Sequence, residues 1–468
     1  MERLSSCCGT VTSKLDSYFC ISERGSTIGT EFRAGTASFL TLSYLLLVNP
    51  QVMSAAGLDH GDALIATALS SAVATLVAGV GGNVPFGMAP GLGLSAYLSY
   101  GLIQSGMADL PEALTACLAS GILLLACALS GITDMIIRIV PRSIKLGIVV
   151  GMGILIAMIG MVSVELIKAN PKTLVELGDL TDWKLQVCLL GLILVGTLII
   201  HDVKGGILIC IASLTLFFWQ VQDSYPQQWV ELPTIQTPIS EKISLGSLFD
   251  GEIAGVMYPA VAAFLIICIF DISGVIFGLS SLAGLTHDGE SPPSLWPFLG
   301  SVAGTIIAAL IGSTPIICTV ECAAGIKEGG RTGLTAVFIS FYFLASLFLA
   351  PLFSAVPEQA TAPILILIGA MMMGDCSKVD WDYMGSALPA FLTIVMMPLT
   401  YSITDGMLFG LVTAACFYVT SGEAFVHLRE WFVKISTRGD ASDGENGVLM
   451  GNKEDKTDEP SYGAADQA

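Results

Sequence analysis

Two carboxylate residues, Asp271 and Glu321, lie in stretches of sequence that are otherwise almost entirely apolar. Asp271 stands in the run LIICIFDISGVIFG, where no neighbouring residue can neutralise its charge. Glu321 directly follows a proline-containing segment, GSTPIICTV. A charged side chain at the centre of a membrane costs about 2.5–3.5 kcal/mol on insertion scales, so such residues usually have a function. Each could instead be structural, Glu321 as a helix cap and Asp271 as a hydrogen-bond partner of another helix.

These two side chains could exchange a proton or bind N–H groups. Surroundings of low polarity favour the neutral form of a carboxyl group, which suits a group that takes up and releases a proton. An ionised carboxylate accepts hydrogen bonds and can serve two adjacent N–H donors. The sequence contains no Cys-x-x-Cys pair and no paired His ligands, so we expect neither a metal site nor a cofactor.

Two short segments combine apolar residues with Pro and Gly. The first, NVPFGMAPGLGLSAY, contains Pro85 and Pro90, and the second, GSTPIICTVECAAG, contains Pro315. Proline removes a backbone donor and interrupts a helix. We predict an extended piece over residues 85–89, then a half-helix with Pro90 in its first turn. Because extended backbone at membrane depth must be buried or line a cavity, each segment forms either a solute site or a kinked packing helix.

The composition of the chain is that of an integral membrane protein. Of its 468 residues 53% are hydrophobic and 13% charged, whereas a soluble domain carries about 25% charged residues. Apolar stretches of about 17–25 residues, the length that crosses a bilayer, recur from residue 32 to 419. We predict fourteen helical spans, near residues 32–49, 62–81, 90–104, 112–133, 144–163, 185–200, 205–221, 253–279, 297–312, 320–327, 333–354, 361–373, 385–400 and 404–420.

The charge distribution supports this number of spans. With the N-terminus in the cytoplasm, the 20 Lys and Arg all fall on the cytoplasmic side except Lys168, Lys172, Lys184 and Lys242, as the positive-inside rule requires. The net charge of −19 comes largely from an acidic tail, which we expect to be disordered. Nothing suggests a nucleic-acid partner. Cys7 and Cys8 precede the first span, where a cysteine can be acylated.

One pattern of spans occurs twice. A long span, a second span and a short interrupted span occupy residues 32–100 and again residues 256–330. Seven spans separate the two sets, an odd number, so the second set has inverted topology. Paired interruptions at matching places in two halves are the best indication in a sequence of a transporter's binding site.

At these motifs the chain resembles the AzgA-like purine permeases of the nucleobase–cation symporters. FLTLSYLLLVNP at 39–50 is similar to that family's first span, and NVPFGMAPGLGLS at 83–95 to its broken third span. Phe270-Asp271 with Gly274 resembles the eighth span. ECAAGIKEGGRTGLTA at 321–336 and PLTYSITDG at 398–406 resemble the tenth and last spans.

The resemblance implies an all-α fold of two inverted sevenfold repeats. It implies uptake of adenine, guanine or hypoxanthine with protons, with cytokinin-type N6-substituted adenines as further substrates, by a homodimer. We expect this in the plasma membrane with both termini cytoplasmic. The domain organisation would be a cytoplasmic segment (1–30), a core domain (31–135 and 253–355), a gate domain (136–225 and 356–421), an extracellular loop (226–252) and an acidic cytoplasmic tail (422–468).

The resemblance also implies a binding site. Asp271 and Glu321 fall on the family's substrate-binding carboxylates, and we expect one of them, Asp271 first, to exchange the proton. Backbone around Ala89, Pro90 and Gly91 and around residues 317–319, including Thr319, would complete the pocket. A purine is a flat ring with N–H donors and nitrogen acceptors on its edge, so an aromatic side chain could stack on its face. The candidates are Phe86, Tyr97 and Phe270.

Some residues depart from the family's pattern and leave other functions open. Ser95 stands where the family usually has Asn, and the run before Glu321 has fewer polar residues than usual. The base preference therefore stays open. An anion transporter of the same fold is the nearest alternative, although a carboxylate repels an anion. A channel would need charged rings or a continuous polar pore. An enzyme would need a nucleophile with a base or a metal cluster.

Overall fold

The structure of the protein is a computed structural model. It describes residues 14–133, 141–170, 173–201, 203, 205–223, 225–226, 228–230, 232–234, 243, 245–246, 254–285 and 295–421. The acylation candidates Cys7 and Cys8, the acidic tail and most of the predicted extracellular loop lie outside these residues. By its internal contacts the chain forms two units, residues 1–414 and 415–468, and the contacts described below lie within the first.

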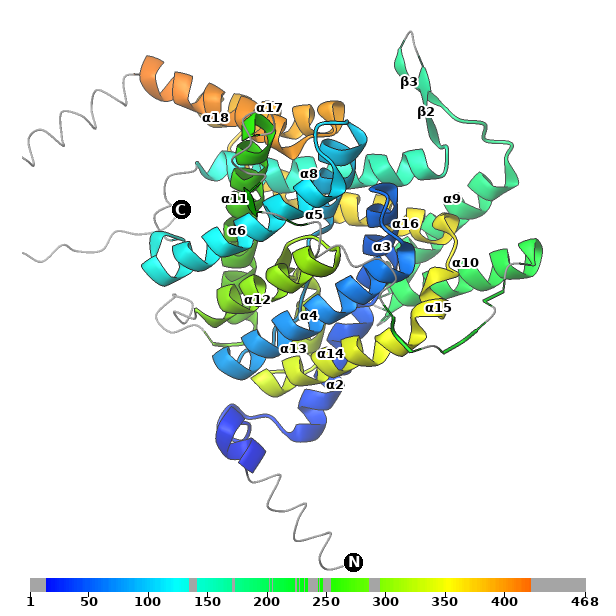
Figure 1. The fold of residues 1–468 in the computed structure, drawn as a ribbon, viewed down its shortest axis with the longest axis vertical. Helices are drawn as coiled ribbons and strands as arrows, with labels where there is room; N and C mark the ends of the chain where they lie inside the picture. The colour runs from blue at the N-terminus through cyan, green and yellow to red at the C-terminus, as the bar shows by residue number, and fades with distance from the viewer. Residues whose placement is uncertain are drawn as a thin grey trace, which may run out of the picture. The chain divides into compact units, whose positions relative to one another are not determined.

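The described residues are mostly helical, with four short strands (Figure 1). The first half contains α2 (Ile28–Leu42), α3 (Leu45–Ala55), α4 (His60–Gly82), β1 (Met88–Pro90), α5 (Leu92–Ala96), a π-helix (Tyr97–Gln104), α6 (Leu110–Ser130), α8 (Arg142–Ser163), β2 (Ile167–Asn170), β3 (Leu174–Leu177), α9 (Trp183–Ile200) and α10 (Gly206–Gln222). The second half contains α11 (Ala254–Leu282), α12 (Trp296–Ile311), β4 (Ile316–Cys318), the 3-10 helix η4 (Val320–Cys322), α13 (Ala323–Lys327), α14 (Gly333–Ser346), η5 (Leu347–Leu349), α15 (Ala350–Ser354), α16 (Glu358–Met372), η6 (Met373–Lys378), α17 (Met384–Thr400) and α18 (Ile403–Thr420).

Each of the fourteen predicted spans corresponds to helical structure. Eight helical segments in the described part of the chain are long and apolar enough to cross a membrane, and α10, α12 and α17 are shorter apolar helices. The three remaining spans are interrupted, by a turn between α2 and α3 and by the strands β1 and β4. The prediction of a helical membrane protein with two broken spans is therefore confirmed.

Two details of the prediction are wrong. Pro90 does not lie in the first turn of a half-helix but ends strand β1, and Gly91 is the residue before α5. Proline fits either place, because a strand end also tolerates a missing N–H. The first span is not one helix: α2 ends at Leu42 and α3 begins at Leu45, although the backbone of Ser43 and Tyr44 keeps right-handed helical dihedral angles. The Ser43 hydroxyl donates to the Leu40 carbonyl at 2.9 Å at this interruption. The antiparallel hairpin of β2 and β3 was not predicted.

The helices pack in two groups. One group joins α4 to α12 and α14, α14 to α2, and α6 to α11 and α12. The other joins α8 to α16 and α17, and α9 to α10 and α16. Figure 1 shows α4 and α12, from opposite halves of the sequence, running side by side. These groups follow the division into core and gate that the resemblance implies, and that division stays a prediction.

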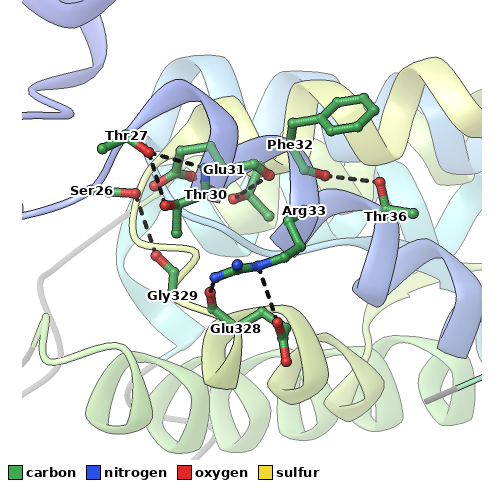
Figure 2. Close-up of polar contacts among 10 residues, drawn as sticks. Ser26, Thr27, Thr30, Glu31, Phe32, Arg33, Thr36, Glu328 and Gly329 are labelled. Carbon is green, nitrogen blue, oxygen red and sulfur yellow. Dashed lines mark hydrogen bonds and ion pairs between the residues drawn. The ribbon is translucent and has the colours of Figure 1, made fainter.

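A buried carboxylate fastens the start of α2 to the start of α14. Glu31 is fully buried, and its two oxygens accept hydrogen bonds from the N–H of Arg331 at 3.1 Å, the N–H of Thr332 at 3.3 Å and the hydroxyl of Thr335. Arg33, two residues later, points outward to Glu328 instead, with its Nε 3.2 Å from the carboxylate (Figure 2). One helical turn therefore holds a buried and an exposed contact to the same segment.

This pair of contacts gives a stability prediction. Glu31→Gln places an NH2 group against donors, and each unsatisfied buried group costs about 1–3 kcal/mol. Arg33→Ala removes an exposed ion pair, whose arginine side chain is 65% accessible, and such pairs contribute about 0–1 kcal/mol. In detergent, the melting temperature of the Glu31→Gln variant should fall well below that of Arg33→Ala. Equal melting temperatures would contradict the importance assigned to Glu31.

Candidate functional site

The two interrupted spans meet as a pair of antiparallel strands. β1 and β4 pair in the register Met88 with Cys318, Ala89 with Ile317, and Pro90 with Ile316. The sequence predicted extended backbone at both breaks, and the structure joins the two breaks directly. Ala89, Pro90 and Gly91 are all buried, so this backbone lies inside the protein, as membrane depth requires.

The pairing relates the two halves by an approximate two-fold rotation. The Gly91 N–H donates to the Pro315 carbonyl, and the Thr319 N–H donates to the Gly87 carbonyl, both at 3.4 Å. Rotation about an axis between Ala89 and Ile317 exchanges these two bonds. This is the relation that inverted repeats produce.

Met88 and Ile316, which the rotation exchanges, have outward-facing backbone groups that bond to hydroxyls in the same symmetric way. The Met88 N–H donates to the Thr75 hydroxyl at 2.9 Å, and that hydroxyl donates to the Met88 carbonyl at 3.2 Å. On the other strand, the Ile316 N–H donates to the Thr305 hydroxyl at 3.0 Å, and Ser301 donates to the Ile316 carbonyl. Side chains of α4 and α12 thus replace the neighbours that a larger sheet would supply.

Glu321 lies immediately after β4, in the 3-10 helix that leads into α13. Its side chain is half-buried, and its Oε1 accepts a hydrogen bond of 2.7 Å from the hydroxyl of Tyr44. Its backbone carbonyl accepts a hydrogen bond of 3.1 Å from Thr41. The first span of the chain therefore holds the acidic residue of the second broken span.

Asp271 occupies the middle of α11 and is half-buried. Within the described part of the chain the Asp271 carboxylate makes no hydrogen bond or ion pair. Helix α11 packs against β4, the 3-10 helix of Glu321 and α13. The structure thus brings the helix of Asp271 to the second broken span and leaves the carboxylate of Asp271 without a protein partner among these residues.

The three aromatic candidates lie in different surroundings. Phe86 is fully buried in the hydrophobic core. Tyr97 is also buried, packs edge-on against Phe264 and accepts a hydrogen bond from Thr404. Phe270 is half-buried, with the Lys145 ammonium group 5.1 Å from its ring centre. Of the three aromatic residues, Phe270 is the one that is not fully buried.

Thr319 and the lining beside it are tightly packed. The Thr319 hydroxyl donates to the Gly87 carbonyl at 3.1 Å, and Thr319 is almost fully buried. Gly91 faces Ile317, since a Cβ atom at Gly91 would lie 2.9 Å from the end of that side chain. Thr319 and Gly91 therefore leave little open space beside the paired strands.

A buried polar network was missed by the sequence analysis. The Asn49 amide donates to Thr67 at 2.7 Å and to Ser313 at 3.2 Å, and its oxygen accepts from Ser95. Ser95 also shares a hydrogen bond of 2.7 Å with Thr314. All five residues are fully buried. The signal was an asparagine inside an apolar span, and the network shows that Ser95, one of the departures from the family, links the two broken spans.

Comparisons with known proteins agree with this architecture. A model described as the Permease family matches residues 29–408. The guanine/hypoxanthine permease PbuO of Bacillus subtilis is 33% identical over 84% of this chain and 92% of its own length. The adenine permease AdeP of Escherichia coli is 31% identical over 87% of this chain and 91% of its own length.

A solved structure shows the same fold. The transmembrane domain of the cyanobacterial bicarbonate transporter BicA aligns with a TM-score of 0.62, over 82% of this chain and 97% of that domain, at 15% identity. At that identity the likeness concerns the fold alone, and it confirms the predicted inverted-repeat class. The chain therefore belongs to the Permease family, as its motifs predicted, and is a membrane transporter rather than an enzyme.

Proposed function

We propose that this protein imports purine nucleobases, namely adenine, guanine or hypoxanthine, together with protons. The observation that carries the proposal is the pair of strands at the two breaks, with Glu321 directly beyond one of them. The two carboxylates near the breaks, Asp271 and Glu321, can accept hydrogen bonds from the N–H groups on the edge of a purine. Relatives named for adenine and for guanine and hypoxanthine support the same class of solute.

The carboxylates favour a neutral solute over an anion. Two like charges 4 Å apart repel by about 1 kcal/mol in water and about 4 kcal/mol at the effective dielectric constant near a protein surface. An anion beside Asp271 and Glu321 would meet this repulsion twice, whereas a purine can donate N–H groups to both. Although this protein shares its fold with a bicarbonate transporter, the shared fold does not imply that it transports bicarbonate.

The finer parts of the proposal have their own support. Asp271 exchanges the coupled proton, because it lies in an apolar helix without a described partner while Glu321 has Tyr44. N6-substituted adenines of the cytokinin type are further substrates, as the family resemblance implies. The protein acts as a homodimer in the plasma membrane, with both termini in the cytoplasm, an orientation that the distribution of Lys and Arg favours.

Substitution of Asp271 tests proton coupling. In cells without their own purine uptake, Asp271→Asn should abolish accumulation of labelled adenine under an imposed pH gradient, because the amide cannot take up and release the proton. The matched control is Asp375→Asn, which alters an accessible carboxylate paired with Lys378 at 2.6 Å and should leave accumulation unchanged. Proton-driven uptake that persists in the Asp271→Asn variant would contradict the assignment of proton exchange to Asp271.

Competition for uptake tests the solute class. Unlabelled guanine and hypoxanthine should reduce labelled adenine uptake at concentrations near the adenine KM, since they offer the same ring edge. Bicarbonate and sulfate should not compete, and uracil should compete less than the purines. Competition by N6-benzyladenine tests whether cytokinin-type N6-substituted adenines are also substrates. Competition by bicarbonate with none by the purines would favour an anion transporter instead.

A further inference from the structure

The first span presents three hydroxyl groups along one face to the second broken span. Ser38, Thr41 and Tyr44 follow one another at intervals of three residues, which places them on the same side of a helix. Ser38 donates to the Cys322 carbonyl at 3.4 Å, and Tyr44 donates to the Glu321 carboxylate at 2.7 Å. The Thr41 hydroxyl lies 3.1 Å from the Glu321 carbonyl and shares its one proton with the Ser38 carbonyl of its own helix, at 2.8 Å. Two of the contacts to the second broken span are made with backbone, and the third is made with the Glu321 side chain.

Tyr44 lies at the interruption between α2 and α3. Its carbonyl accepts hydrogen bonds from the N–H of Leu47 at 3.0 Å and from the N–H of Val48 at 2.9 Å, which joins it to the start of α3. Tyr44 is 2% exposed, so its ring is fixed by packing. A buried tyrosine hydroxyl needs a hydrogen-bond partner, and this one has Glu321. Its single proton is therefore committed to one oxygen of that carboxylate.

This contact does not exhaust the Glu321 carboxylate. Among the described residues, the Glu321 carboxylate accepts hydrogen bonds from the Tyr44 hydroxyl and from its own backbone N–H, and no other side chain donates to it. Because each carboxylate oxygen can accept more than one hydrogen bond, capacity for a solute remains. Glu321 is half-buried, whereas Tyr44 is enclosed. The Tyr44 hydroxyl thus bonds to Oε1 and restricts rotation of the Glu321 carboxylate. The orientation of Oε2 is thereby fixed as well.

We propose that Tyr44 is a positioning residue, whose hydroxyl orients the Glu321 carboxylate toward the N–H groups of the bound purine. The inference rests on the proposed function, since it assumes that Glu321 binds the solute. Tyr44 acts through Glu321 and makes no contact with the purine itself. A side chain that fixes a binding group in one geometry strengthens binding because the bound state then requires less ordering.

Tyr44→Phe tests the proposal, because it removes the hydroxyl and keeps the ring. The KM for labelled adenine should rise about tenfold, the effect of losing roughly 1.4 kcal/mol of binding free energy. The maximal rate per molecule at the cell surface should stay within about twofold of that of the unaltered protein. Loss of a contact that only strengthens solute binding raises KM and leaves the maximal rate unchanged. Surface amount and melting temperature in detergent are measured for each variant, so that misfolding is recognised.

Thr41→Val is the matched control on the same helix face. It removes a hydrogen bond to the backbone of the same residue, at 3.1 Å, and leaves the carboxylate contact intact. Its KM should remain within about twofold of the original value. If both variants raise KM equally, or if Tyr44→Phe lowers only the maximal rate, Tyr44 supports the fold and the proposal is overturned.

Glu321→Gln separates failure of this inference from failure of the proposed function. If the unaltered protein takes up no purine, the proposed function is wrong, whatever the role of Tyr44. If Glu321→Gln abolishes adenine uptake and Tyr44→Phe leaves KM unchanged, only the role of Tyr44 is wrong. If Glu321→Gln keeps the original KM, Glu321 does not bind the purine and the positioning role is wrong as well.

Discussion

Hydrogen bonding between β1 and β4 is the constraint on which the rest of the structure depends. An unsatisfied backbone group in the hydrocarbon region costs several kcal/mol, so neither broken span is tolerable alone. The two three-residue strands pair with each other along their inner edges, and hydroxyls of α4 and α12 bond to the outer edges at Met88 and Ile316. The two halves of the chain must therefore assemble together, and the packing of α4 against α12 follows from that need.

The features that the sequence could predict are those with local causes. Apolar length defines a span, and Pro85, Pro90 and Pro315 mark where helices break. The contacts that were missed have distant partners: Tyr44 and Glu321 are 277 positions apart, and Ser95 and Thr314 are 219 apart. No local pattern identifies such a partner. The exact place of Pro90 was wrong for a different reason, because a helix start and a strand end both accept a residue without an N–H.

Neutral polar residues and carboxylates have separate places in the broken-span region. The Asn49 network is fully buried, and its amide donors and oxygen all have partners. A satisfied buried network fixes one arrangement of the segments that it joins. Ser95 belongs to this network and bonds to both Asn49 and Thr314, so it connects the first broken span to the second. Asp271 and Glu321, in contrast, are half-buried and keep capacity for further hydrogen bonds.

The two-fold relation between the breaks holds for the backbone and fails for the side chains. The rotation that exchanges Gly91 with Thr319 also exchanges Gly93 with Glu321. At Gly93 a Cβ atom would lie 2.5 Å from the sulfur of Met152 on α8, so a side chain there would collide with the neighbouring helix. The same position in the second half carries a carboxylate, and Tyr44 of the first half bonds to it. The first repeat thus supplies a closely packed glycine, Gly93, and the orienting hydroxyl of Tyr44, whereas the second repeat supplies the charged group, Glu321. A symmetric backbone frame can therefore carry different side chains at equivalent positions of its two halves, and the proposed purine site uses this asymmetry.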